Sequence, residues 1–256
     1  MKRIFPAVFA ILVMLLISFT PVLAAPPADN PGKGHPEFDR IVFVHYADNS
    51  AKKGSGGSST PQLYSYSGYH WKSNTVTYFV NLSGNRIANA DAVNGITASF
   101  QTWQNDPNSQ ISFNYQGTTT IVPGLDADSP DYQNVVGWAY LSDKYPRAIA
   151  ITIVWASRGN KFIVDSDTVL NSDSYFAWTQ AYLATNPNST FLTQTSKYDV
   201  DVQNIMTHEA GHWLQLNDLY GSVAVEQTMY GISSDRELKK RNLESGDLVG
   251  IKNIYP

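Results

Sequence analysis

Two histidines separated by three residues lie within a segment whose apolar residues follow a helical period. The motif is His208-Glu209-Ala210-Gly211-His212, and the apolar positions around it are Val202, Ile205, Met206 and Trp213. Residues four apart share one face of an α-helix, so the pattern predicts a long helix, capped by Asp199, that carries both imidazoles on its inner face. Burying polar rings without a partner costs free energy. The fold must therefore provide a partner for these two rings.

The same spacing suits a metal ion. Two imidazole nitrogens one helical turn apart reach a single zinc at about 2.0–2.1 Å, and Glu209, beside the first ligand, reaches a metal-bound water. A catalytic zinc takes three protein ligands and keeps one position open. Asp218, six residues after His212, is the candidate for the third ligand. Carboxylates further downstream that could complete a different metal site are Glu226, Glu237 and Glu244.

The order of these residues resembles that of the metzincin zinc metallopeptidases, and most closely the matrixin-like secreted members. In that family a turn after the helix delivers the third ligand, and a methionine-containing turn lies under the metal. Met229, followed by Tyr230, stands in that place here. Asp218 replaces the usual histidine, as in the snapalysin-like members. The similarity runs from about Gly68 to Pro256 and includes Tyr78–Asn81, Val136–Ala139, Ile163–Asn171, Trp178 and Leu243–Asp247.

One residue departs from the family's pattern in the turn that follows the helix. Gln215 stands where the family has a glycine. That glycine ends the helix in a left-handed conformation, which a side chain resists by roughly 1 kcal/mol. We expect Asn217 to take the left-handed position instead.

The order of elements favours an α+β fold over a doubly wound parallel sheet. The resemblance implies a metzincin-like twisted, mostly parallel sheet with an antiparallel edge strand, two long helices and a C-terminal helix. The first long helix is expected to be capped by Asn89. The expected strands are 76–80, 111–115, 134–141, 148–156 and 168–170, after a short one at 41–44. An extended substrate would add to an exposed sheet edge near 137–140 or 149–153.

The resemblance implies a zinc-dependent endopeptidase that acts on a protein or peptide substrate. Zinc held by His208, His212 and Asp218 lowers the pKa of its bound water, and Glu209 passes the water proton to the leaving amine. Tyr230 either assists the oxyanion or packs beside the methionine turn. Two alternatives stay open. One is a thermolysin-like zinc peptidase with a distal glutamate ligand, and the other is a non-catalytic secreted metal-binding module.

A second ion is implied near two acidic loops. Asp165 and Asp167 lie where the resemblance places an ion-binding region, and calcium prefers oxygen ligands. Solvated turns are the alternative interpretation of these two residues. The remaining histidines are expected on the surface or packed in strands; they are His35, His45 and His70.

The N-terminus predicts export. Lys2 and Arg3 precede an apolar run over 7–17, and the segment 22–24 places small residues at the two positions that a signal peptidase reads, so residues 1–24 are predicted to be a cleaved signal peptide. A single-pass anchor is the alternative, although the run is shorter than the roughly 20 residues that span a bilayer. The mature protein is then secreted and extracellular, with residues 25–63 as a pro-segment or linker and residues 64–256 as the catalytic domain.

Net charge and the lack of cysteine exclude some classes of partner and one way of inhibiting the enzyme. The 18 basic and 22 acidic residues give a net charge of −4, so nucleic acid and, after signal cleavage, membranes are not expected partners. The chain has no cysteine, which excludes a thiolate on the zinc as a latency device.

If residues 25–63 inhibit, the strand at 41–44 covers the cleft, or Asp39, Asp48 or His45 occupies it. Alternatively the strand simply adds to the domain. A Gly- and Ser-rich tract at 52–60 is the expected processing site, and we expect a monomer.

Overall fold

The computed structural model describes residues 37–47, 63–180 and 198–256. The predicted signal peptide, His35, Asp48 and the tract at 52–60 lie outside these described residues. Gly32 to Pro256 belong to one compact unit, which therefore includes the strand predicted at 41–44. Within the described ranges, no helix is both long enough and apolar enough to cross a membrane.

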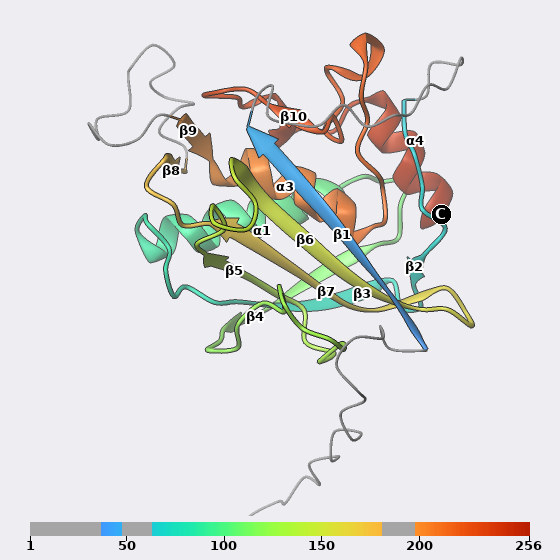
Figure 1. Ribbon diagram of the computed structural model, residues 1–256. Coiled ribbons are helices and arrows are strands. Elements are labelled where there is room, and N and C mark those ends of the chain that lie inside the picture. The colour runs from blue at the N-terminus through green and yellow to red at the C-terminus, as the bar shows by residue number, and fades with distance from the viewer. Residues whose placement is uncertain (1–36, 48–62, 181–197) are drawn as a thin grey trace, which may run out of the picture. The chain divides into compact units, whose positions relative to one another are not determined.

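An eight-stranded mixed sheet forms the base of the structure (Figure 1). Its strands run in the order β10-β1-β6-β7-β5-β3-β4, with β2 paired to β7, and β8 and β9 form a separate parallel pair. Strands β7, β5, β3 and β4 are parallel. The bounds are β1 Phe38–Ala47, β2 His70–Trp71, β3 Thr75–Val80, β4 Ser112–Thr118, β5 Val135–Ala139, β6 Ala148–Ser157, β7 Phe162–Asn171, β8 Phe176–Thr179, β9 Tyr198–Asp201 and β10 Ile232–Ser233.

The predicted α+β class is confirmed, but the antiparallel strand is not at the edge of the sheet. β6 runs antiparallel to β7, and β1 pairs along its other side from Phe38↔Ser157 to Tyr46↔Ala148. β10 lies outside β1. The stretch 149–153 is therefore already paired, and 137–139 lies in β5, inside the sheet. The expectation of an exposed edge at either place is wrong.

The composition of β6 explains its interior position. Its sequence alternates alanine with isoleucine, then adds Thr152, Val154 and Trp155, and all residues but the last are buried. Such apolar runs are typical of strands that are covered on both faces. On the face away from the helices, Ile151, Ile153 and Trp155 pack with Val42 and Val44 of β1.

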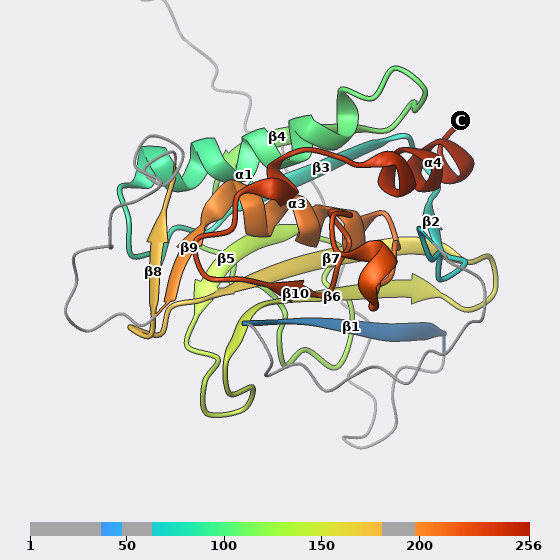
Figure 2. The ribbon, with the colours of Figure 1, turned by 90° about the horizontal axis from the view of Figure 1, so that it is seen from above.

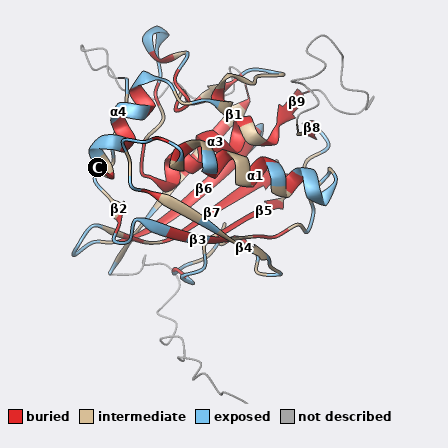
Figure 3. Ribbon diagram, turned by 180° about the vertical axis from the view of Figure 1, so that it is seen from behind, coloured by how far each residue is buried: buried red, intermediate tan, exposed pale blue. Residues whose placement is uncertain are grey.

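Two helices cover the other face of the sheet (Figure 2). Helix α1, Asn89–Gln104, packs against α3, Val202–Trp213, and a C-terminal helix, α4, spans Ser245–Ile254. The Trp103 indole of α1 donates a hydrogen bond to the Thr207 carbonyl of α3 at 2.7 Å. Every residue of α3 except Gln203 is buried. Figure 3 shows α3 coloured as buried, and its apolar side chains belong to the main hydrophobic core. The predicted metal-binding helix is therefore central to that core.

The predicted helix caps lie one or two residues from the observed ones. The residue before α1 is Ala88, which makes no side-chain cap, and Asn89 is the first residue of the helix. Helix α3 is capped by Asp201 rather than Asp199, because the Asp201 carboxylate accepts the Asn204 N–H at 2.9 Å. Asp199 lies in β9. Strand β9 ends at Asp201 and α3 begins at the next residue, so Asp201 and not Asp199 is the residue that caps the first turn.

The turn after α3 keeps the left-handed residue at position 215. Gln215 has a φ of 63°, so the expectation that Asn217 would take this conformation is wrong. The Leu216 N–H bonds to the Gly211 carbonyl at 3.0 Å and the Gln215 N–H to the His212 carbonyl at 2.9 Å, which is the Schellman pattern. The Gln215 side chain accepts a hydrogen bond from Ser67 at 2.5 Å. This contact offsets part of the backbone cost.

Gly211 permits the close packing of α3 on the methionine turn. An ideal Cβ at this position would lie 2.2 Å from Met229 Sδ and 2.9 Å from Trp103 Cζ2. Gly→Ala in a helix interior normally stabilises by about 0.5–1 kcal/mol. Here we expect Gly211→Ala to lower the free energy of unfolding by about 1–3 kcal/mol in urea denaturation, because the methyl group overpacks the core.

The matched control is the double variant Gly211→Ala/Met229→Ala. It should lose less stability than the two single changes together, because the smaller residue at 229 makes room for the methyl group. A Gly211→Ala variant as stable as the parent would contradict this account of the packing.

Candidate metal centre

Three predicted ligands converge at the C-terminal end of α3. His208 Nε2 lies 3.1 Å from His212 Nε2 and 3.1 Å from Asp218 Oδ1, and His212 Nε2 lies 3.4 Å from that oxygen. Ligand atoms around a tetrahedral zinc with bonds of about 2.0–2.1 Å are about 3.3 Å apart. The three atoms therefore have the spacing of one face of a zinc tetrahedron.

The hydrogen bonds of the two rings set their tautomers. His208 Nδ1 lies 2.8 Å from the Thr228 carbonyl and His212 Nδ1 lies 2.8 Å from the Leu216 carbonyl. Since a carbonyl only accepts, each Nδ1 carries the proton and each Nε2 presents a lone pair. Asp218 Oδ1 is buried without a hydrogen-bond partner. Three electron pairs thus face one point, an arrangement that a cation would satisfy.

The protonation states around this point also favour a cation. Burial lowers the pKa of His208 to about 4, which keeps that ring neutral. Burial opposes charge on His212 too, but the Asp218 carboxylate outweighs it and raises the pKa of His212. In turn, despite its burial, Asp218 has a pKa well below its usual range because both histidines lie beside it. The ionised Asp218 carboxylate thus stabilises positive charge beside it, and a metal ion would take the place of a proton on His212 Nε2.

Glu209 lies next to the triad and both of its carboxylate oxygens are bonded. Thr152 of β6 donates to Oε2 at 2.6 Å, and His45 of β1 donates from Nδ1 to Oε1 at 3.1 Å. The Thr152 hydroxyl is itself 2.7 Å from that of Thr168, which accepts from the Trp213 indole. Burial raises the pKa of Glu209 to about 7. A carboxylate with such a pKa is suited to accept and release a proton near neutral pH.

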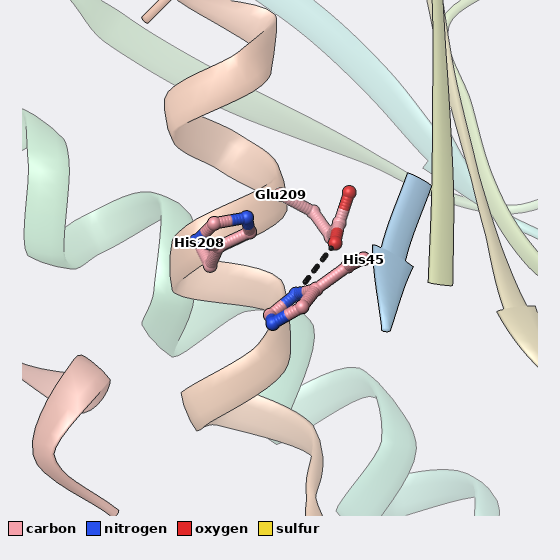
Figure 4. Close-up of side chains that lie close together, drawn as sticks. All are labelled: His45, His208 and Glu209. Carbon is pink, nitrogen blue, oxygen red and sulfur yellow. Dashed lines mark hydrogen bonds and ion pairs between the residues drawn. The ribbon is translucent and has the colours of Figure 1, made fainter. Parts of the chain in front are cut away.

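Strand β1 contributes two side chains that lie directly over the ligands. The ring of Phe43 stacks on His212 with centroids 4.0 Å apart and planes at 5°, and the ring of His45 lies 4.0 Å from that of His208. Figure 4 shows His45 reaching from the end of β1 towards Glu209 on α3. With these rings in place, His208, Glu209 and His212 are 0% exposed.

A buried lysine completes the cluster. Lys240 Nζ donates to the carbonyls of Tyr230 and Ile232 and to the Ser233 hydroxyl, at 2.6, 3.1 and 3.0 Å. It also lies 3.2 Å from His45 Nε2, which accepts because Nδ1 holds the ring proton. Burial lowers the pKa of Lys240 to about 8. Lys240, His45 and Glu209 thus form one hydrogen-bonded chain.

One residue of this cluster, Lys240, was missed by the sequence analysis, since nothing near it in sequence marks burial. His45 was expected at the surface, in strand packing or, if residues 25–63 inhibit, in the cleft. It lies in β1, where it contacts both His208 and Glu209. Phe43 and His45 are two residues apart on this strand and so share a face. His70 packs edge-on against Phe162, in agreement with strand packing.

The other predicted site residues have structural contacts. Met229 is buried against Gly211, and its N–H bonds to Asp247 at 3.3 Å. Tyr230 contributes its carbonyl to Lys240, and its ring packs on the core. The three alternative glutamates are engaged elsewhere: Glu226 with Lys239, Glu237 with Lys240, and Glu244 in the capping box of α4.

The carboxylates of Asp165 and Asp167 accept hydrogen bonds from loop backbone, and Asp165 Oδ1 is buried without a hydrogen-bond partner. Asp167 accepts the N–H groups of Gly124 and Val135 at 2.6 and 2.8 Å, and Asp165 accepts that of Asp131 at 3.0 Å. Burial raises the pKa of Asp165 to about 7 and that of Asp167 to about 8. Among the described residues, the groups of three or more ligating side chains whose ligand atoms converge are His208–His212–Asp218 and His45–His208–Glu209. A calcium site at Asp165 and Asp167 stays a prediction.

No model of a known protein family matches this chain, and no curated protein matches it significantly. The chemistry of the site therefore rests on its own residues.

Replacing the third ligand tests the metal centre. We expect Asp218→Ala to lower bound zinc sharply, because two neutral imidazoles alone leave a weak site. Glu226→Ala, Glu237→Gln and Glu244→Gln should retain zinc, because these glutamates are engaged outside the ligand triad. Metal analysis of the purified proteins decides the matter. Zinc loss in a glutamate variant, with Asp218→Ala unaffected, would favour the thermolysin-like scheme.

The buried Asp165 predicts a pH dependence of stability. Its folded-state pKa of about 7 lies above the ordinary value of 3.8, so the folded protein holds this proton more tightly than the unfolded chain. Its contribution to stability is full at low pH and is lost as the pH rises from about 4 towards 8. We expect urea denaturation to show the wild type losing stability over this window relative to Asp165→Asn.

Adding calcium to the same two proteins tests whether Asp165 and Asp167 bind an ion. A bound calcium ion would offset the repulsion between the buried carboxylates, so it should stabilise the wild type more than Asp165→Asn at about pH 8. Equal responses of the two proteins would remove the case for a calcium site there. Parallel pH curves without calcium would contradict the raised pKa.

Proposed function

We propose that this protein is a secreted zinc-dependent endopeptidase that hydrolyses peptide bonds in protein or peptide substrates. The observation that carries the proposal is the convergence of His208 Nε2, His212 Nε2 and Asp218 Oδ1 beside the Glu209 carboxylate. A structural zinc site has no need of a second, non-ligating carboxylate beside Asp218, whereas hydrolysis needs a proton carrier. Export is supported by the N-terminal sequence alone.

The finer fold assignment belongs to the same proposal. The order of β4, β3, β5 and β7 as parallel strands, followed by the antiparallel β6, agrees with the metzincin-like sheet that the sequence resemblance implies, except that β1 and β10 lie outside β6. The position of Met229 against α3 also agrees with a methionine turn beneath the ligands. These features support membership of that group.

The residues divide the chemistry among themselves. A bound zinc supplies Lewis acidity and lowers the pKa of a bound water. Thr152 fixes Glu209 through Oε2, so Oε1 is the atom that accepts the proton of the attacking water and later delivers it to the leaving amine. The carbonyls of Thr228 and Leu216 orient the two imidazoles. Because a water serves as nucleophile, the reaction requires no covalent intermediate with the protein.

A non-catalytic metal-binding module is the second candidate. It is favoured by one observation, namely that His45 and Thr152 bond both oxygens of Glu209 and leave none facing solvent. In such a module Glu209 would serve only to hold β1 on α3.

Glu209→Gln separates the two candidates. The change preserves shape and all three ligands, so zinc should stay bound, but hydrolysis of labelled casein should fall about 10²- to 10⁴-fold because the proton carrier is lost. Since β1 covers the site, both proteins are assayed intact and after cutting between Ala47 and Leu63. Activity should also disappear with a zinc chelator. Full activity of zinc-loaded Glu209→Gln would refute the mechanism, and an inactive wild type in both forms would favour the module.

A further inference from the structure

Strand β1 is bonded on both of its sides within the candidate site. It runs antiparallel to β6, with Phe43 opposite Thr152 and Val44 opposite Ile151. Its last two residues then pair in parallel with β10, Tyr46 with Ile232 and Ala47 with Ser233. β1 therefore lies between the strand that carries Thr152 and the segment that follows Met229 (Figure 1).

The side chains of β1 face the reacting groups. On the face towards α3, Phe43 stacks on His212 and His45 lies over His208 and bonds to Glu209. Because successive residues of a strand point to opposite faces, Val42 and Val44 lie on the other face and pack with Ile151 and Ile153. One strand thus occupies this position with both its backbone and its side chains.

This arrangement closes the site. The ligand histidines and Glu209 are 0% exposed, and only Asp218, with its side chain 15% exposed, borders the solvent. A substrate peptide needs its carbonyl beside the ligands and its backbone along a strand edge. β1 already takes the strand edge of β6, and its side chains lie over the ligands.

We propose that β1 is an internal occupant of the peptide-binding groove, which keeps the protein latent until an extended peptide segment takes its place between β6 and β10. This inference rests on the proposed function, since it names the groove in which the substrate binds. The groove would receive an extended segment with an aromatic side chain over His212 and apolar side chains on the opposite face. The resident strand itself satisfies this pattern.

The remainder of the site is held together by contacts that do not involve β1. Lys240 keeps three hydrogen bonds and its ion pair with Glu237 when His45 leaves. Glu209 keeps its bond from Thr152, and both ligand histidines keep their carbonyl partners. What the departure of His45 changes is Glu209 Oε1, which becomes accessible as the proton acceptor.

The test uses the full chain with two additions. A recognition sequence for a specific cysteine protease is inserted between Ala47 and Leu63, so that β1 can be cut from the rest of the protein. Val42→Cys and Ile153→Cys, which are paired neighbours on the face away from the ligands, allow β1 to be locked by a disulfide. Since the natural chain has no cysteine, this pair gives the only thiols. Its state is verified by mass and reversed with a non-chelating phosphine.

Two readouts are compared in the intact, cut-oxidised and cut-reduced forms. The first is uptake of a fluorescent peptide of residues 37–47, which reports exchange of the strand without any catalysis. The second is hydrolysis of labelled casein with zinc present. We expect the cut-reduced form to take up the peptide and to hydrolyse casein roughly tenfold faster or more than the others, because cutting removes the high effective concentration of the tethered strand. The cut-oxidised form should do neither.

The outcomes separate the two proposals. Peptide uptake confined to the cut-reduced form, with no hydrolysis in any form, would support the occupant role and reject the peptidase. Equal hydrolysis in all three forms would overturn the occupant role and keep the peptidase. Absence of uptake is checked with Phe43→Ala/His45→Ala in the resident strand, which weakens its contacts with α3. If the wild-type peptide still fails to displace that strand, β1 is a permanent part of the sheet and the inference is wrong.

Discussion

Three electron-rich atoms held within 3.1–3.4 Å of one another are the constraint on which this structure depends. The two imidazole nitrogens cannot move apart, because each ring is fixed from behind by a backbone carbonyl. Helix α3 must therefore be buried, must end directly after His212, at Trp213, and must be followed by a short turn that brings Asp218 to the histidines. Each of these requirements is met by a feature that would otherwise be unfavourable: a polar helix in the core, a left-handed glutamine and a carboxylate oxygen without a partner.

The surrounding layers make these unfavourable features tolerable. Gly211 lets Met229 and Trp103 approach the helix closely. A row of hydrogen bonds runs from the Trp213 indole through the hydroxyls of Thr168 and Thr152 to the Glu209 carboxylate. The polar groups of the interior are thus connected to one another, and the core orients the carboxylate instead of excluding it.

Local patterns predicted the elements well, and contacts between distant segments explain what they missed. The long helix and the converging ligands follow from residues within eleven positions of one another, so spacing alone was informative. Cap positions shifted because β9 joins α3 directly, and Gln215 kept the left-handed turn because Ser67, far away in sequence, bonds its side chain. The role of His45 depends on the pairing of β1 with β6. No local pattern encodes such a register, since a strand shows its period but not its neighbour.

Because β1 belongs to the same polypeptide as the site that it covers, its occupancy of the site does not depend on protein concentration. A separate inhibitor leaves when the protein is diluted, whereas a strand within the same polypeptide has an effective concentration set by its tether, on the order of millimolar for a short flexible one. Closure of the groove is then independent of how many copies are present or how large a volume they enter. Breaking one peptide bond changes that local concentration irreversibly, so the molecule can record a single cutting event as a permanent change of state.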